Sequence, residues 1–407
     1  MSKTWVQKGL MAIVVGVGLI LVFILGLYGY VIATMKPLHP NAQEVSAVTN
    51  ATPPQKWAGA VEQGRRIVRA HLTEKNLPGL SVAVGAGGDM VWAEGFGWAD
   101  LEKRVPVAPE TRFRIGTAST ALTSAAVGLL LEKNQIKLDE KIQTYVPEFP
   151  EKQSPVTLRQ LMAHTAGVRS DDGDEGSLFT VRCERPVDAL QYFKDKSLWF
   201  EPGTKYRFSN YSFILVSAAV EEAAHEKFLP FMRKQIFEPL GMAHTEADSA
   251  TEPIQNRATF YFPRFAADPR YGPDLMRPLD YSCYSGSSAF LSTSSDLVRF
   301  ALAINSGKLL QPATVQLLQA SQRLPSGEET GYGLGWDIET VDLAGRPTRA
   351  VGHDGDSLGG QVASFMMFPE SGIVVSVTSN ISYADTFGVA VKIAQAFAEH
   401  ARSPAAK

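Results

Sequence analysis

Residues 113–120, FRIGTAST, place three hydroxyl groups at the start of a predicted helix. Such a position suits a nucleophile, because unpaired amides and the positive end of the helix dipole stabilise a developing anion. A hydroxyl is hardly ionised at neutral pH, so it reacts only when a neighbouring base takes its proton. Thr117 and Ser119 are the candidate nucleophiles, and Thr120 lies one turn after Thr117. Another part of the chain must supply the base.

A second segment, EPGTKYRFSNYSFILVSAAVE, combines aromatic and amide side chains at the start of another predicted helix. Phe208 and Asn210 lie two residues apart in it, and Tyr206 and Tyr211 flank them. Phenylalanine has no hydroxyl with which to carry a proton, whereas an amide can hold a substrate by hydrogen bonds. We therefore take Phe208 and Asn210 as catalytic positions and the two tyrosines as candidates for substrate binding.

A third segment, Gly352-His353-Asp354-Gly355, precedes a predicted strand near the C-terminus. His353 is the candidate base, because imidazole titrates near neutral pH. Asp354 and Gly355 are candidates for substrate binding beside it. The alternative is a histidine in a turn with no chemical role.

In order and spacing, the three segments resemble the S-x-x-K, Y-x-N and K-T-G or H-x-G motifs of serine β-lactamases and penicillin-binding proteins. The resemblance covers nearly all of residues 78–399, and at YVPEFPEK it is especially similar to mitochondrial serine β-lactamase-like proteins. It implies a class C β-lactamase-like fold shared with DD-peptidases and esterases. It also implies that the family's serine, lysine and tyrosine positions hold Thr117, Thr120 and Phe208 here.

Two functions are compatible with these substitutions. The first is a β-lactamase-related hydrolase of amide or ester (peptide or acyl) substrates, in which Thr117 or Ser119 attacks and His353 replaces the missing base. The second is a non-catalytic protein that binds a peptide or cell-wall fragment, or that serves as a scaffold. Removing one member of a cooperating catalytic set costs on the order of 10⁴–10⁶ in rate. Whether the chain is an enzyme is therefore left open.

Residues 9–33 form an uncharged apolar run, GLMAIVVGVGLILVFILGLYGYVIA. A helix of that length spans about 37 Å, which is enough to cross a bilayer. A signal-peptide core is shorter, about 7–15 residues, and ends at a small-residue cleavage site. Lys3 and Lys8 precede the run and only Lys36 follows closely, which places the N-terminus in the cytoplasm and the rest outside it. We predict a single-pass membrane anchor.

The soluble part is predicted to be α/β, because strand patterns occur at both ends and helical patterns fill the middle. We expect one antiparallel sheet flanked by terminal helices, a mainly helical inserted lobe, and a substrate cleft between the two lobes. The predicted divisions are a cytoplasmic tail (1–8), the anchor (9–33), a flexible linker (34–56), the β-lactamase-related domain (57–400) and a tail (401–407). Within the domain, the sheet lobe is 57–112 and 325–400, and the helical lobe is 117–310.

Composition excludes some other functions. The net charge is −3 and no basic patch is interleaved with aromatic residues, so nucleic acid is not an expected partner. No Cys/His cluster suggests zinc, and the acidic run 171–175 lacks EF-hand spacing, so no metal or cofactor is expected.

Cys183 and Cys283 are predicted to be buried free thiols, although export would favour a disulfide. His164 is predicted to be structural. The oligomeric state is left open.

Overall fold

An antiparallel sheet forms the centre of one lobe in the computed structural model, which describes residues 3–170, 177–357 and 360–402. In the described part this sheet has eight strands, with β4 (Val105–Pro106) pairing with β3 off the main path. The order along the sheet is β1 (Ala47–Thr49), β3 (Asp89–Asp100), β2 (Gly79–Ala86), β13 (Ile373–Ser379), β12 (Gln361–Phe368), β11 (Pro347–Ser357) and β10 (Asp337–Asp342).

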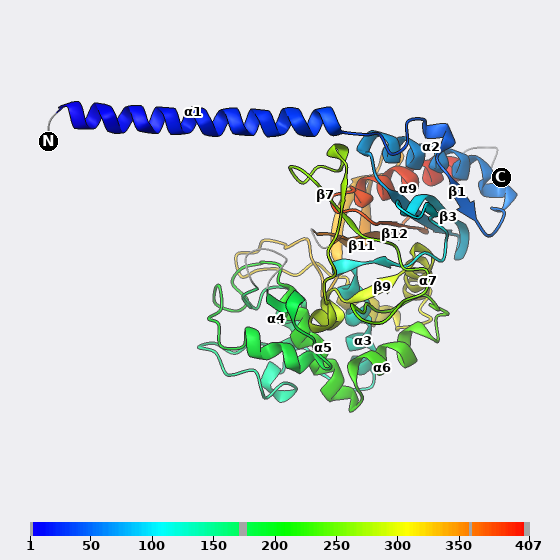
Figure 1. The fold of residues 1–407 in the computed structure, drawn as a ribbon. Helices are drawn as coiled ribbons and strands as arrows, with labels where there is room; N and C mark the ends of the chain where they lie inside the picture. Colours follow the sequence, from blue (N-terminus) through cyan, green and yellow to red (C-terminus); the bar gives the residue numbers. More distant parts are fainter. Residues whose placement is uncertain (1–2, 171–176, 358–359, 403–407) are drawn as a thin grey trace.

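Both faces of the sheet are covered, which explains why β2 and β13 are buried along their whole length. The terminal helices α2 (Ala58–Lys75) and α9 (Thr386–Arg402) lie side by side on one face (Figure 1), where Trp57 stacks on Phe397. Helix α7 (Ser294–Asn305) covers the other face. There the hydroxyl of its first residue donates to the Ser81 carbonyl of β2.

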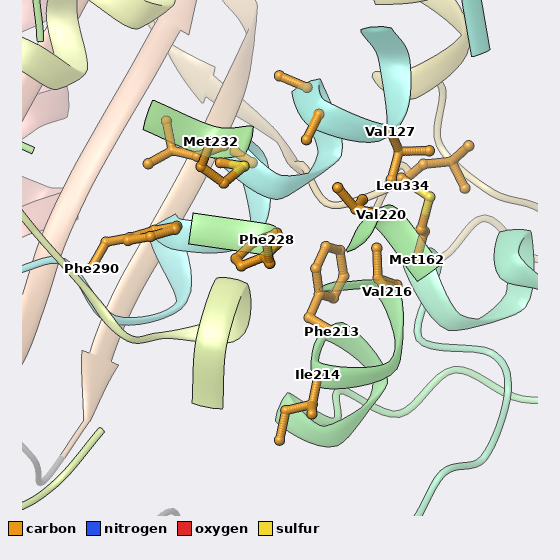
Figure 2. Close-up of a cluster of buried hydrophobic side chains, with 14 of the residues drawn as sticks. Val127, Met162, Phe213, Ile214, Val216, Val220, Phe228, Met232, Phe290 and Leu334 are labelled. Carbon is orange, nitrogen blue, oxygen red and sulfur yellow. The ribbon is translucent and has the colours of Figure 1, made fainter. Parts of the chain in front are cut away.

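The second lobe is mainly helical and has its own core. Helices α3 (Ser119–Glu132) and α5 (Asn210–Ala224) are apolar on nearly all sides, and most residues of each are buried, as expected for helices at the centre of a lobe. Figure 2 shows part of this core. The remaining helices and strands are α1 (Lys3–Thr34), α3 (Ser119–Glu132), α4 (Leu158–Met162), α5 (Asn210–Ala224), α6 (Phe228–Met232), α8 (Pro312–Leu318), β5 (Phe113–Arg114), β6 (Glu246–Ala247), β7 (Tyr261–Pro263), β8 (Pro273–Leu275) and β9 (Phe290–Ser292).

The predicted arrangement of an antiparallel sheet, terminal helices and an inserted helical lobe is confirmed, with three local differences. In the middle of the chain, where helical patterns predict α-helix, the segment Pro186–Tyr192 forms a 3₁₀ helix. The expected linker 34–56 is not wholly flexible, because β1 pairs with β3 at the sheet edge. Strand β10 was not foreseen as a separate element. The acidic run 171–175 lies outside the described residues.

Helix α1 extends from the sheet lobe as one long apolar helix (Figure 1). Its part from Lys8 to Thr34 is long and apolar enough to cross a membrane. A helix of this kind near the N-terminus is equally compatible with a signal sequence.

The free-thiol prediction is wrong, because Cys183 and Cys283 form a disulfide. The two cysteines are 100 residues apart in sequence, and only the folding of the helical lobe brings them together. Disulfides persist in oxidising compartments. Together with the apolar N-terminal helix, the bond indicates a protein of the secretory pathway.

Replacing Cys183 and Cys283 together by alanine should lower the free energy of unfolding by about 2–5 kcal/mol, because the bond closes a long loop in the unfolded chain. Urea unfolding of the oxidised protein and of the double variant measures the difference. Treating the unsubstituted protein with a reductant should reproduce the variant's curve. If two thiols react with an alkylating reagent in the denatured, unreduced protein, the disulfide is absent and the prediction fails.

Candidate active site

The two lobes meet where β11 passes the start of α3. Thr117 lies in the 3₁₀ turn Gly116–Ala118 that leads into α3, and its hydroxyl donates to the backbone carbonyl of Asp354 at 3.2 Å. A Cβ at Gly355 would lie 2.9 Å from Thr117 Oγ1 and 3.1 Å from its backbone nitrogen. A residue larger than glycine would force Thr117 to shift. The structure thus brings the first and third segments together.

His353 is buried on the same side of β11, and both of its nitrogens have partners. Nδ1 lies 2.9 Å from the carbonyl oxygen of Asp354 and 3.4 Å from Oδ2 of Asp337. Both of these atoms accept hydrogen bonds, so Nδ1 carries the proton. Nε2 then accepts from the hydroxyl of Tyr332 at 3.0 Å. The lone pair that would make His353 a base is therefore engaged by a phenol.

The three candidate hydroxyls differ in access. Ser119 and Thr120 are fully buried. Ser119 Oγ has no hydrogen-bond partner within the described chain, and Thr120 Oγ1 donates to the Thr117 carbonyl at 2.9 Å. Thr120 Oγ1 also lies 3.5 Å from the Tyr332 hydroxyl. Thr117 alone of the three is partly exposed, so it is the one candidate nucleophile that a ligand can reach.

Aromatic rings surround this hydrogen-bonded group. The Phe208 ring centroid lies 4.2 Å from that of His164 and 6.4 Å from that of His353. Tyr206 lies 5.9 Å from Tyr332, centroid to centroid. Tyr206 and Phe208 retain solvent exposure, whereas Tyr332 is buried. Both Tyr206 and Phe208 therefore belong to the site, the second without a phenol.

His164 is a neutral side chain that packs against the Phe208 ring of the site. Its Nδ1 accepts a hydrogen bond from the backbone amide of Ser209 at 3.2 Å. Burial, and then the nearby imidazole of His353, holds the pKa of His164 well below its usual value. His164 therefore positions the segment that carries Phe208 and brings no charge to the site.

Two predicted residues, Tyr211 and Asp354, have their side chains elsewhere, whereas Asn210 is partly exposed at the start of α5. Tyr211 is buried in the helical lobe and stacks on Phe193 at 4.6 Å. Asn210 opens α5 and accepts from the Ser287 hydroxyl at 3.1 Å. The Asp354 carboxyl accepts from Ser364 of β12, on the opposite face of β11 from His353, because neighbouring strand residues point to opposite faces. Asp354 contributes only its backbone beside Thr117.

Tyr332 and Asp337 belong to the site, although the motifs did not point to them. Tyr332 lies in the glycine-rich run GYGLGW before β10. In that run Gly335 has a φ of +92°, and a Cβ there would lie 2.9 Å from Phe213 Cζ. Clustered glycines indicate a close backbone approach, and this was the one sequence signal that could have found Tyr332.

The Asp337 carboxylate brings negative charge to the site. Burial, and then the Asp337 carboxylate, raises the pKa of Tyr332 well above its usual value. The phenol therefore stays protonated at neutral pH and cannot act as a base. In the described residues, no group of three or more His, Cys, Asp or Glu side chains is placed to hold a metal ion.

The sequence model of the family described as "Beta-lactamase" matches residues 65–399. The chain belongs to the β-lactamase family. It is 26% identical to the human serine β-lactamase-like protein LACTB, mitochondrial, over 84% of this chain and 80% of that protein. It is also 26% identical to penicillin-binding protein 4* of Bacillus subtilis (strain 168), over 70% and 64% of the two chains. Its fold is similar to that of the D-amino acid amidase of Ochrobactrum anthropi SV3, complexed with L-phenylalanine amide. That likeness has a TM-score of 0.72 and 22% identity, and covers 84% and 99% of the two chains.

Restoring the family's lysine alone, by Thr120→Lys, should destabilise this β-lactamase-family protein by on the order of 3–5 kcal/mol. Thr120 is fully buried, and the groups near its hydroxyl are Tyr332, Gly335 and the Thr117 carbonyl, none of them a carboxylate. Thermal unfolding of the variant measures the loss. Thr120→Val is the control, because it removes only hydrogen bonds, and it should cost about 1 kcal/mol. A higher melting temperature for the lysine variant would show that a shell of partners for a lysine is still present.

Proposed function

We propose that this protein binds a peptide or other acyl-amide ligand beside Thr117 and does not perform the rapid acyl transfer of active β-lactamase relatives. One observation carries the proposal. The accessible hydroxyl, Thr117, donates to the Asp354 carbonyl, while the imidazole of His353 accepts from Tyr332. Thr117 and His353 each hydrogen-bond to other groups, so no base is directed at the nucleophile.

The expected loss of acylation rate is large enough to support this proposal. A hydroxyl without a base has almost no alkoxide at neutral pH. The lysine and tyrosine positions of the family hold Thr120 and Phe208, so two proton-handling groups are replaced together. Losing one member of such a set costs on the order of 10⁴–10⁶ in rate. The methyl group of Thr117 further crowds an attacking oxygen.

Features that hold a ligand remain in place. Gly355 keeps β11 in contact with Thr117, and the rings of Tyr206 and Phe208 are partly exposed beside it. The amidase with a similar fold was crystallised with an amino-acid amide, which fits an amide-bearing ligand of modest size. Ligand sites commonly form where two lobes meet.

A second candidate is slow hydrolysis of an ester or amide with Thr117 as the nucleophile. The observation that favours it is the order Asp337, His353, Tyr332, in which a carboxylate orients an imidazole that accepts from a hydroxyl. This order is that of a catalytic triad, but its hydroxyl is a buried phenol. Movement of Tyr332 away from His353 would free Nε2 to act as a base.

We also propose that α1 anchors the protein in a membrane by a single pass, with the domain outside the cytoplasm. The uncharged run is long enough to span a bilayer, and lysines precede it. The disulfide fits a domain in an oxidising compartment.

Labelling by a fluorescent penicillin tests the loss of acylation. The unsubstituted protein should label very slowly or not at all. The triple variant Thr117→Ser, Thr120→Lys and Phe208→Tyr should label faster than any single variant, because the three groups act as a unit. Adding Thr117→Ala to the other two changes should abolish that labelling, which serves as the control.

Rapid labelling of the unsubstituted protein that survives Thr117→Ala would contradict the proposal. Hydrolysis of a nitrophenyl ester that is lost in His353→Ala, with an unchanged melting temperature, would instead establish the second candidate. If the unsubstituted protein acylates readily and His353→Ala leaves the rate unchanged, neither candidate stands.

The anchor is tested by fractionation and by fusion. The mature protein should keep residues 1–34 by mass spectrometry and should resist carbonate extraction from membranes, whereas a variant lacking residues 2–34 should be extracted. Alkaline phosphatase fused after residue 407 should be active, because that enzyme needs an oxidising compartment. Removal of α1 from the mature chain would identify a signal sequence, and a fusion active only as a cytoplasmic reporter would reverse the topology.

A further inference from the structure

The ligand-facing side of the site is built from aromatic rings and one carboxylate. Tyr206 is 36% exposed and Phe208 is partly exposed, and both rings pack against His164, at centroid distances of 6.4 Å and 4.2 Å. Tyr332 closes the inner side, 5.9 Å from Tyr206 and 6.5 Å from Phe208. Aromatic faces carry partial negative charge, so an open ring surface of this kind attracts cations.

The carboxylate is Asp337, at the first position of β10. Its Oδ2 accepts from the backbone amide of Asp354 at 2.8 Å and lies 3.4 Å from Nδ1 of His353. Its Oδ1 has no hydrogen-bond partner in the part of the chain that the structure describes, and the side chain is 27% exposed. One oxygen is thus held rigidly by the protein, and the other is left for a ligand.

The positive charge of active relatives is missing from this place. The position of the family's lysine holds Thr120, and His164 is neutral. The nearby Arg207 places its guanidinium over the Trp199 ring, 3.7 Å from the centroid. Asp337 is also the group whose charge, after burial, raises the pKa of Tyr206 and of Tyr332. The local field is therefore set by a carboxylate.

We infer that the ligand of this site carries an ammonium group, which pairs with Asp337 and lies against the rings of Tyr206 and Phe208. The inference rests on the proposed binding function and specifies its ligand class. A carboxylate and aromatic faces both stabilise an ammonium when it leaves water. A ligand carboxylate in the same place would be repelled by Asp337 and would find no lysine. A peptide with a free N-terminus, or an amine-bearing acyl compound, has the required chemistry.

Three matched dipeptide amides test the inference by calorimetry or by ligand-detected NMR. Alanyl-phenylalanine amide is a cation, its N-acetyl form is neutral, and its N-succinyl form is an anion. The free amine should bind about tenfold more tightly than the acetyl form, and the succinyl form should bind more weakly still. Raising the salt concentration should weaken the binding of the free amine and leave the binding of the acetyl form nearly unchanged.

Asp337→Asn should remove most of the preference for the free amine. Asp342→Asn is the control, because Asp342 is an exposed acid at the other end of β10, and its variant should keep the preference. Tyr206→Leu should weaken the binding of the free amine more than the binding of the acetyl form. Melting temperatures verify that each variant is folded.

The outcomes separate the two proposals. Equal or tighter binding of the acetyl or succinyl form, lost in Tyr206→Leu, would overturn ammonium selection and leave ligand binding at the site intact. A preference for the free amine that persists in Asp337→Asn would also overturn it. If none of the three compounds binds, both the ammonium inference and the proposed binding function are contradicted.

Discussion

The close approach of β11 to the start of α3 is the contact on which the site depends. Gly355 has no Cβ, so the strand lies against the backbone and hydroxyl of Thr117 and places the Asp354 carbonyl within its reach. This contact joins the sheet lobe to the helical lobe. It also fixes the position of His353, which lies two residues before Gly355 in β11 and therefore on the same face of the sheet. A side chain at position 355 would crowd Thr117 and force a local shift of this contact.

A second layer of contacts determines what the site can do. Asp337 and the Asp354 carbonyl hold the proton of His353 on Nδ1, and Tyr332 occupies Nε2. Thr120 directs its hydroxyl to the helix backbone. In a buried setting every polar group needs a partner, because an unpaired one costs free energy. Here Thr117, Thr120, His353 and Tyr332 all hydrogen-bond to groups of the protein, which stabilises this part of the fold.

The replacement of a lysine and a tyrosine by Thr120 and Phe208 changes the electrostatic character of the site as well as its proton chemistry. Without the lysine, the carboxylate of Asp337 is the charge that its neighbours experience. The proposed ligand class follows from this change of charge. An aromatic surface and a single carboxylate are the features on which the proposed binding function rests.

The sequence by itself determined the fold class and the division into a sheet lobe and an inserted helical lobe. These features follow from local patterns, namely strand and helix periodicity. It also pointed to Tyr206 and Phe208, whose rings lie near Tyr332 in the structure. The alternation of a strand could have warned that Asp354 faces away from His353, because that is a local property as well.

Only the tertiary structure decided the partners that come from distant segments. The disulfide joins cysteines 100 residues apart, and Tyr332 reaches His353 from a loop that no motif marks. The same holds for Tyr211, whose helix turns it into the core of the helical lobe. Hydrogen-bond direction and ring packing depend on which side chains share a volume, and that is set by the packing of the two lobes. The fold, and not the motif, therefore decides whether Nε2 of His353 is free to act as a base or accepts a hydrogen bond from Tyr332.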